Sequence, residues 1–141
     1  MGVTAPRTVL FVCAHGAYRS RLAAAFFNAS APDGWRATSA GVEPQAAISA
    51  AAVDLVAGTV GESRLERGTP SALADAGPRD RTVAIDCAVP GAERWDLAVT
   101  EVGPAQRDEI RARAEALAAE LRADRATPSR PPQSPRPPRA R

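Results

Sequence analysis

Apolar residues gather in four short runs, each of which predicts a β-strand. The run Thr8–Val12 is almost continuously apolar, as expected of a strand buried on both faces of a parallel sheet. A second run covers Arg36–Ser39 and is closed by Gly41. The third and fourth runs are Thr82–Asp86 and Leu97–Thr100. Four strands, spread along the chain, are therefore predicted.

Apolar residues at helical spacing separate these strands. A helix is predicted at Arg19–Asn28, and a second begins near Ile48 and ends before Gly58. Residues 59–80 show little pattern and predict an extended loop with a short helical turn. The clearest helix has Pro104 in its first turn, and its apolar stripe consists of Ile110, Ala114, Leu117 and Leu121.

This alternation of strands and helices predicts a single α/β domain. Right-handed, short connections favour a four-stranded parallel sheet of flavodoxin-like order 2-1-3-4, with helices on both faces. In such sheets, ligands bind beyond the carboxyl ends of the strands where the strand order reverses. Here that point lies between the first and third strands. Cys13 directly follows the first strand.

Length and charge bound the domain and its partners. The 141 residues allow one domain, assigned to 1–125, and a Pro/Arg-rich segment at 126–141 that is predicted to be disordered. That segment either solubilises the protein or docks a partner. Residues 1–125 hold 14 arginines against 16 acidic residues. The domain is thus mildly acidic, and no nucleic-acid partner is expected.

Cysteine and apolar content bound the compartment and the cofactors. No stretch approaches the roughly 18 apolar residues of a membrane span, so no membrane partner is expected and a cytoplasmic location is predicted. In that compartment, two cysteines are more often free thiols or a transient redox pair than partners in a structural disulfide. One histidine and two cysteines cannot form the usual four-ligand zinc cage, so no metal is predicted.

The stretch "VLFVCAHGAYRSRLAA" carries the candidate chemistry. A C-x5-R spacing between a strand and a helix lets backbone N–H groups curl around a tetrahedral anion, while Arg19 grips two of its oxygens. The loop and the hydroxyl of Ser20 would stabilise the thiolate of Cys13. The alternative is an inert, buried strand-end cysteine. The predicted oxyanion-binding loop consists of Ala14, His15, Gly16, Ala17, Tyr18 and Arg19.

Three stretches give the chain a family resemblance: "VLFVCAHGAYRSRLAAAFFN", "TSAGVEP" and "ERWDLAV…RDEIRARAEAL". With them, residues 7–123 resemble the low-molecular-weight protein tyrosine phosphatase superfamily, and within it the arsenate reductases of that fold. The resemblance implies that Cys13 is the nucleophile, Arg19 the oxyanion clamp and Ser20 the stabiliser of the thiolate.

The sequence departs from the family pattern at two places. Gly16 stands where the family has an asparagine that braces the loop. Glycine accepts the required positive φ, but the side-chain bonds of the brace are lost. The family's Asp-Pro after the last strand is also missing, and its aspartate would fall at Val99. Asp96 is predicted at the wrong end of that strand. Glu101 is therefore either a substitute general acid or an ordinary surface carboxylate.

A second cysteine occupies a matching position. The segments "RTVLFVC" and "RTVAIDC" end at Cys13 and Cys87. Their strands are neighbours in a 2-1-3-4 sheet, about 4.8 Å apart, so the two sulfurs are expected at the same edge, near the separation that a disulfide needs once the loops relax. The alternative for Cys87 is a small buried residue. The resemblance implies that Cys87 is the resolving cysteine of an arsenate reductase.

The predicted activity is the reduction of arsenate to arsenite. No bound cofactor is expected, but a thiol reductant is required, either a thioredoxin-like protein or a low-molecular-weight thiol. The third cysteine of the thioredoxin-coupled members is missing from "AVPGAER". Two alternatives remain open: hydrolysis of phosphomonoesters through a cysteinyl-phosphate, as in protein tyrosine phosphatases, and a degenerate member that binds an oxyanion or a partner without turnover.

Overall fold

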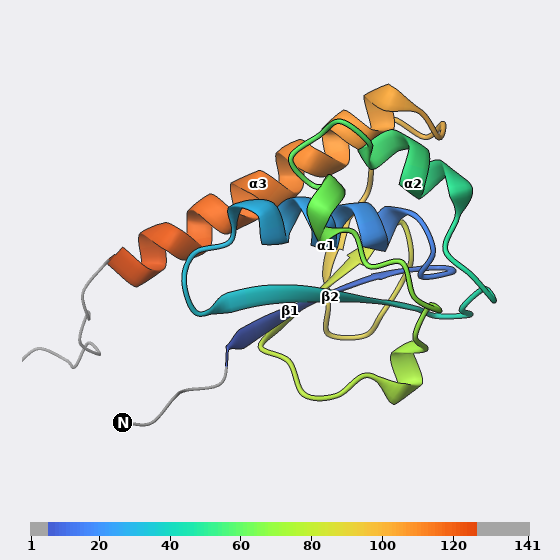
Figure 1. Cartoon of the computed structure of the whole chain (residues 1–141). Helices are drawn as coiled ribbons and strands as arrows, with labels where there is room; N and C mark the ends of the chain where they lie inside the picture. Colours follow the sequence, from blue (N-terminus) through green and yellow to red (C-terminus); the bar gives the residue numbers. More distant parts are fainter. Residues whose placement is uncertain (1–5, 127–141) are drawn as a thin grey trace, which may run out of the picture.

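The computed structural model describes residues 6–126 (Figure 1). The predicted tail at 126–141 lies outside this range, except for Ala126 at the end of the last helix. No helix in the described part of the chain is long and apolar enough to cross a membrane. The elements are, in order, β1 Arg7–Cys13, α1 Arg19–Ser30, β2 Trp35–Gly41, α2 Ala50–Val56, the 3-10 helices η1 Glu62–Arg64 and η2 Leu73–Asp75, β3 Arg81–Ile85, β4 Glu93–Trp95 and α3 Pro104–Ala126.

All four strands form one parallel sheet in the order β2-β1-β3-β4. The predicted fold class, a single α/β domain with this strand order, is confirmed. The pairing of Val12 with Ala84 sets β1 against β3, so the carboxyl ends of these central strands lie side by side. Cys13 is the last residue of β1. Cys13 therefore lies at the carboxyl edge of the sheet, beside the point between β1 and β3 where the strand order reverses.

The α-helices pack on one face of the sheet (Figure 1). Alternate residues of β1, including Phe11, point into this core, where the Phe11 ring meets those of Phe27 and Trp95 at centroid distances of 6.1 and 5.4 Å. Each such fully buried side chain contributes roughly 1.5–3 kcal/mol. The predicted stripe of α3 is confirmed, since all four of its residues are buried here: Ile110, Ala114, Leu117 and Leu121.

The other face of the sheet has a thinner cover than the prediction of helices on both faces implies. Leu10 and Val12 of β1 form a small buried cluster with Ala40, covered by Leu73, Ala76, Cys87 and Val89. These covering residues come from the short η2 turn and from loops. The physical reason is that residues 59–80 lack apolar residues at helical spacing, so no α-helix with an apolar face can form there.

The fourth strand lies earlier in the chain than its apolar pattern predicts. The structure places β4 at Glu93–Trp95, whereas the prediction of a strand at Leu97–Thr100 is wrong. Side-chain carboxylates bind the backbone N–H groups of Leu97, Ala98 and Val99. These groups are thus no longer free for a strand ladder. Asp96 consequently follows the carboxyl end of β4 instead of preceding the strand.

Candidate active site

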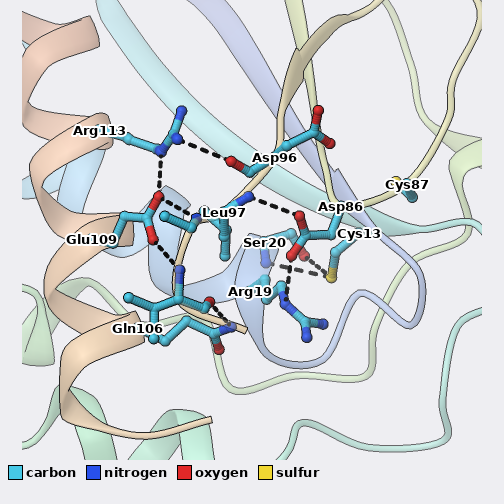
Figure 2. Close-up of polar contacts among 12 residues, drawn as sticks. Cys13, Arg19, Ser20, Asp86, Cys87, Asp96, Leu97, Gln106, Glu109 and Arg113 are labelled. Carbon is cyan, nitrogen blue, oxygen red and sulfur yellow. Dashed lines mark hydrogen bonds and ion pairs between the residues drawn. The ribbon is translucent and has the colours of Figure 1, made fainter. Parts of the chain in front are cut away.

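The thiol of Cys13 is buried at the end of β1, with 2% of the residue exposed. It donates a hydrogen bond to Oγ of Ser20 at 3.1 Å, and the N–H of Ser20 points back at the sulfur at 3.4 Å (Figure 2). Ser20 is itself fully buried in the first turn of α1. Its hydroxyl and N–H can both donate to a thiolate at this position. The structure therefore brings Cys13 and Ser20 together.

The loop between β1 and α1 turns its carbonyl groups outward. All six carbonyls from Cys13 to Tyr18 accept hydrogen bonds, at 2.8 to 3.1 Å. In a trans peptide the next N–H points the opposite way, so the N–H groups of residues 14–19 face the concave side of the loop, beside the N-terminus of α1. Such a nest binds an anion. The donors to these carbonyls are, in chain order, the N–H groups of Val42, Glu43 and Gln45, Nε–H of Arg21, and the N–H groups of Ser49 and Leu22.

Gly16 lies where the loop packs closely against the end of β2. Its φ is +65°, which glycine adopts without strain. A Cβ built on Gly16 would lie 2.7 Å from the backbone nitrogen of Gly41 at the end of β2. The asparagine of the family pattern would therefore collide with β2 unless the backbone moved. Gly16 and Gly41 together allow the close approach of loop and sheet.

Arg19 has a carboxylate partner that the sequence did not reveal. Its Nε lies 3.4 Å from Oδ2 of Asp86, an ion pair whose geometry falls short of a hydrogen bond. Asp86 directly follows β3 and has a φ of +54°, a conformation that aspartate tolerates better than most residues. Oδ1 of Asp86 accepts the N–H of Leu97 at 2.9 Å (Figure 2). Asp86 thus links Arg19 to the chain after β4.

Asp86 could have been noticed as a charged residue that closes an otherwise apolar strand. Its positive φ and its ion pair with Arg19 depend on tertiary structure, which the spacing of residues does not show. Glu101, the predicted substitute acid, is exposed and makes no hydrogen bond or ion pair within residues 6–126. Asp96 pairs with Arg94 at 2.7 Å. In the described part of the chain, neither carboxylate forms a hydrogen bond or an ion pair with the loop.

The two remaining polar side chains of the loop face different surroundings. His15 is exposed, and its Nδ1 lies 3.3 Å from the carbonyl of Glu43. Tyr18 is 8% exposed, and burial raises the pKa of its hydroxyl, an effect partly offset by the backbone of Gly103 and the charge of Arg19. The hydroxyl makes no well-aligned hydrogen bond. His15 thus lies outside the anion nest, and Tyr18 packs beside Arg19.

Glu109 of α3 fixes the segment that follows β4. Its two carboxylate oxygens accept the N–H groups of Ala98 and Val99 at 2.9 and 2.8 Å, and Nε of Arg113 donates to it at 3.0 Å. Burial raises the pKa of Glu109, but these hydrogen bonds and the charge of Arg113 outweigh it, so its net pKa is lowered. Since a lowered carboxyl pKa stabilises the folded state above the unfolded pKa, this contribution is lost as the pH falls below about 4.5.

We expect Glu109→Gln to destabilise the protein at neutral pH by about 1–3 kcal/mol, because an amide cannot accept all three charge-assisted bonds. The difference from wild type should shrink as the pH falls below about 4, where Glu109 itself becomes protonated. Thermal unfolding at both pH values measures it. Glu115→Gln is the control, since Glu115 forms only a half-exposed pair with Arg111. Equal loss in both variants would contradict the special role of Glu109.

Cys87 lies at the same sheet edge as Cys13 but toward the other face. It follows Asp86, two residues beyond the end of β3, and packs with the thinly covered cluster of Leu10 and Val12. Its thiol donates weakly to the carbonyl of Val12, at 3.6 Å. Burial, and then the charge of nearby Cys13, raise the pKa of Cys87. Both thiols are free, and the thiol of Cys87 is directed at the carbonyl of Val12.

Solved structures of arsenate reductases have the same fold as this chain. An arsenate reductase from Archaeoglobus fulgidus is 30% identical, with a TM-score of 0.64, over 79% of this chain and 98% of its own. A thioredoxin-dependent arsenate reductase from Corynebacterium glutamicum is 23% identical, with a TM-score of 0.68, and the match covers 87% of this chain but 65% of that protein.

A phosphatase has the same architecture. The low-molecular-weight protein tyrosine phosphatase from T. tengcongensis is 19% identical, with a TM-score of 0.56, over 84% of this chain and 99% of its own. No protein-family model matches the sequence, and a search of curated proteins gives no match either. The anion nest at Cys13, the strand order and the 30% identity to an arsenate reductase lead to one conclusion. The chain belongs to the low-molecular-weight protein tyrosine phosphatase superfamily, which includes arsenate reductases of this fold, and carries the site for cysteine-dependent oxyanion chemistry.

Proposed function

We propose that this protein reduces arsenate to arsenite, with Cys13 as the nucleophile and Cys87 as the resolving cysteine. The observation that supports it most is the second free thiol at the edge of the sheet that also carries Cys13. Hydrolysis of a phosphomonoester has no use for this second thiol. The 30% identity to an arsenate reductase that matches over most of both chains supports the same reaction.

The first step is attack of the Cys13 thiolate on arsenate. Arsenate lies in the nest of N–H groups, with Arg19 holding two of its oxygens. The sulfur forms a bond to arsenic, and the hydroxyl group of arsenate takes up a proton from solvent and leaves as water. Ser20, hydrogen-bonded to the sulfur, stabilises the thiolate before attack. The preorganised donors favour the charge that develops on the arsenic oxygens.

The second step transfers two electrons. Cys87 loses its proton to water and attacks the sulfur of Cys13. A disulfide forms, and the electron pair of the sulfur–arsenic bond stays with arsenic, which leaves as arsenite. A thiol reductant then reduces the disulfide and is itself oxidised to a disulfide. Because the sequence holds no third cysteine, the reductant, a thioredoxin-like protein or a low-molecular-weight thiol, attacks the Cys13–Cys87 bond directly.

Motion of Cys87 is part of this proposal. Its thiol points toward the carbonyl of Val12 and must leave that contact to reach Cys13. Cys87 is followed by the turn at Pro90 and Gly91, where Gly91 has a φ of +78°. A raised pKa keeps the resting Cys87 as a thiol, so attack follows its movement and deprotonation.

The test is a peptide map of the reduced protein by mass spectrometry after addition of stoichiometric arsenate, with phosphate as the control. We expect the Cys13–Cys87 disulfide to form with arsenate and not with phosphate. In Cys87→Ser, arsenate should give no intramolecular disulfide, while iodoacetamide still alkylates Cys13. Free Cys13 and Cys87 after arsenate treatment would contradict the two-cysteine reductase. Release of phosphate from phosphomonoesters by the same preparation would then favour a phosphatase.

A further inference from the structure

One carbonyl of the anion-binding loop is held differently from the other five. The carbonyls of Cys13, Ala14, His15, Ala17 and Tyr18 accept bonds from backbone N–H groups, whereas that of Gly16 accepts Nε–H of Arg21 at 3.1 Å. Arg21 lies in the first turn of α1 and is 4% exposed. A side chain of α1 thus supplies the donor at Gly16, whereas the other five carbonyls have backbone donors.

Within residues 6–126, the hydrogen-bond partners of the Arg21 guanidinium are all backbone carbonyls. Nη1 donates to Glu66, and Nη2 donates to Gly68 at 2.8 Å. Burial lowers the pKa of Arg21, while the charges of Glu66 and Cys13 raise it. A buried arginine is costly unless its donors are satisfied, and here three of its nitrogens each reach a carbonyl. Arg21 therefore joins the loop to the chain that follows η1.

Residues 66–72 lead from these carbonyls to Gly41, the residue of β2 that lies against Gly16. The carbonyl of Ser71 accepts the N–H of Gly41 at 2.9 Å, and Ala72 forms an isolated bridge with Gly41. Gly41 in turn lies against Gly16. Arg21 and residues 66–72 thus hold both sides of the close approach between loop and sheet. The hydrogen bond from Arg21 holds the carbonyl of Gly16, and Gly41, itself held by Ser71, packs against the backbone of Gly16.

We propose that Arg21 is a positioning residue of the oxyanion site. By holding the carbonyl of Gly16, it keeps the N–H of Ala17 directed into the nest, because the two groups of one trans peptide point in opposite directions. The Gly16–Ala17 peptide rotates through ψ of Gly16 and φ of Ala17, and glycine restricts its own side of this rotation least because it has no Cβ. Rotation would replace an N–H donor by a carbonyl oxygen, which repels an anion.

This role concerns anion binding and is independent of whether arsenate reduction follows. It does the work that an asparagine brace at residue 16 does in the family pattern, from a position that can reach the carbonyl without a clash at Gly41. The prediction is that Arg21→Ala weakens phosphate binding about 10- to 100-fold, as expected for loss of a charge-assisted hydrogen bond and a rotated peptide. Arg21→Lys should weaken it by a smaller factor.

The measurement is protection of Cys13 from iodoacetamide by inorganic phosphate, in the full chain and well below the unfolding midpoint of each variant. Arg122→Ala is the control, since Arg122 also donates to a carbonyl, that of Ser30, but far from the loop in sequence and at the other end of α1. It should keep the phosphate concentration for half protection. A folded Arg21→Ala or Arg21→Lys that binds phosphate like wild type overturns the proposal.

Chemical rescue separates positioning from general stability. Arg21 lines a hollow of about 630 Å³ beside β2, through which a small cation can enter the space left by Arg21→Ala. Millimolar guanidinium should restore phosphate protection in this variant, and sodium at the same ionic strength should not. Restoration by both ions, or by neither in a folded variant, contradicts the proposed hydrogen bond.

A measurement on the wild-type protein needs no variant to fold. Nuclear magnetic resonance should show the amide of Ala17 shifting when phosphate is added, and Nε–H of Arg21 protected from exchange with water. An Ala17 amide that does not respond to phosphate, in a protein whose other loop amides do, overturns the proposal. A wild-type protein in which phosphate protects neither Cys13 nor the loop overturns it as well.

Discussion

Replacing Cys13 by serine is expected to remove the activity and to preserve oxyanion binding. The serine hydroxyl is a far weaker nucleophile than a stabilised thiolate, so turnover should fall by a factor on the order of 10⁴ or more. The nest of N–H groups and Arg19 do not depend on the sulfur. Phosphate should bind about as tightly as in the wild type, because the donors that hold the anion remain in place.

Two assays of one preparation test this expectation: arsenite release in the presence of a thiol reductant, and calorimetric titration with phosphate. Cys87→Ser is the matched control at the same sheet edge. It should also fail to release arsenite repeatedly, but it retains the reactive Cys13. Arsenite release by Cys13→Ser at more than background rate would show that another group is the nucleophile.

Replacing Arg19 by alanine should cost about 10²- to 10³-fold in kcat/KM, the usual effect of losing one donor aimed at the developing charge. Arg19 is the first residue of α1, and its Nε forms an ion pair with Asp86, which follows β3. Arg19→Lys should recover only part of the loss, because a point charge cannot grip two oxygens at once.

Steady-state kinetics with arsenate, together with phosphate titration, distinguish binding from catalysis for Arg19. Loss of contacts that bind the substrate in its ground state raises KM, whereas loss of contacts made only in the transition state lowers kcat. Arg36→Ala is the control, since Arg36 is an exposed arginine of β2. Wild-type kinetics in Arg19→Ala would exclude it as the oxyanion clamp.

The sheet, and the position of Cys13 at the end of its first strand, could be predicted from sequence because the decisive features are local. A continuous apolar run ends at Cys13, and short connections restrict the strand order. The stripe of α3 likewise depends only on helical spacing. The fourth strand could not be placed, because the carboxylates of Asp86 and Glu109 come from other elements and take the N–H groups of Leu97 to Val99.

The site itself was only partly predictable for a similar reason. Spacing identifies Cys13, Arg19 and Ser20, which one turn of loop and helix brings together. Arg21 follows them directly, yet a charged residue at that position is normally expected on the surface. Its burial depends on carbonyls some 45 residues later in the chain. No local pattern encodes such a contact.

The hydrogen bonds that hold the loop of Cys13 are separate from the segment that carries Cys87. Within the described chain, the carbonyls of residues 13–18 are held by residues 42–49, by Arg21 and by the first turn of α1, and none is held by residues 87–92. The segment of Cys87 rests on the face of the sheet with the thinner cover. The movement of Cys87 that the proposed reaction needs can therefore occur by local unfolding, at a small share of the global free energy, without breaking a hydrogen bond to the carbonyls of the loop.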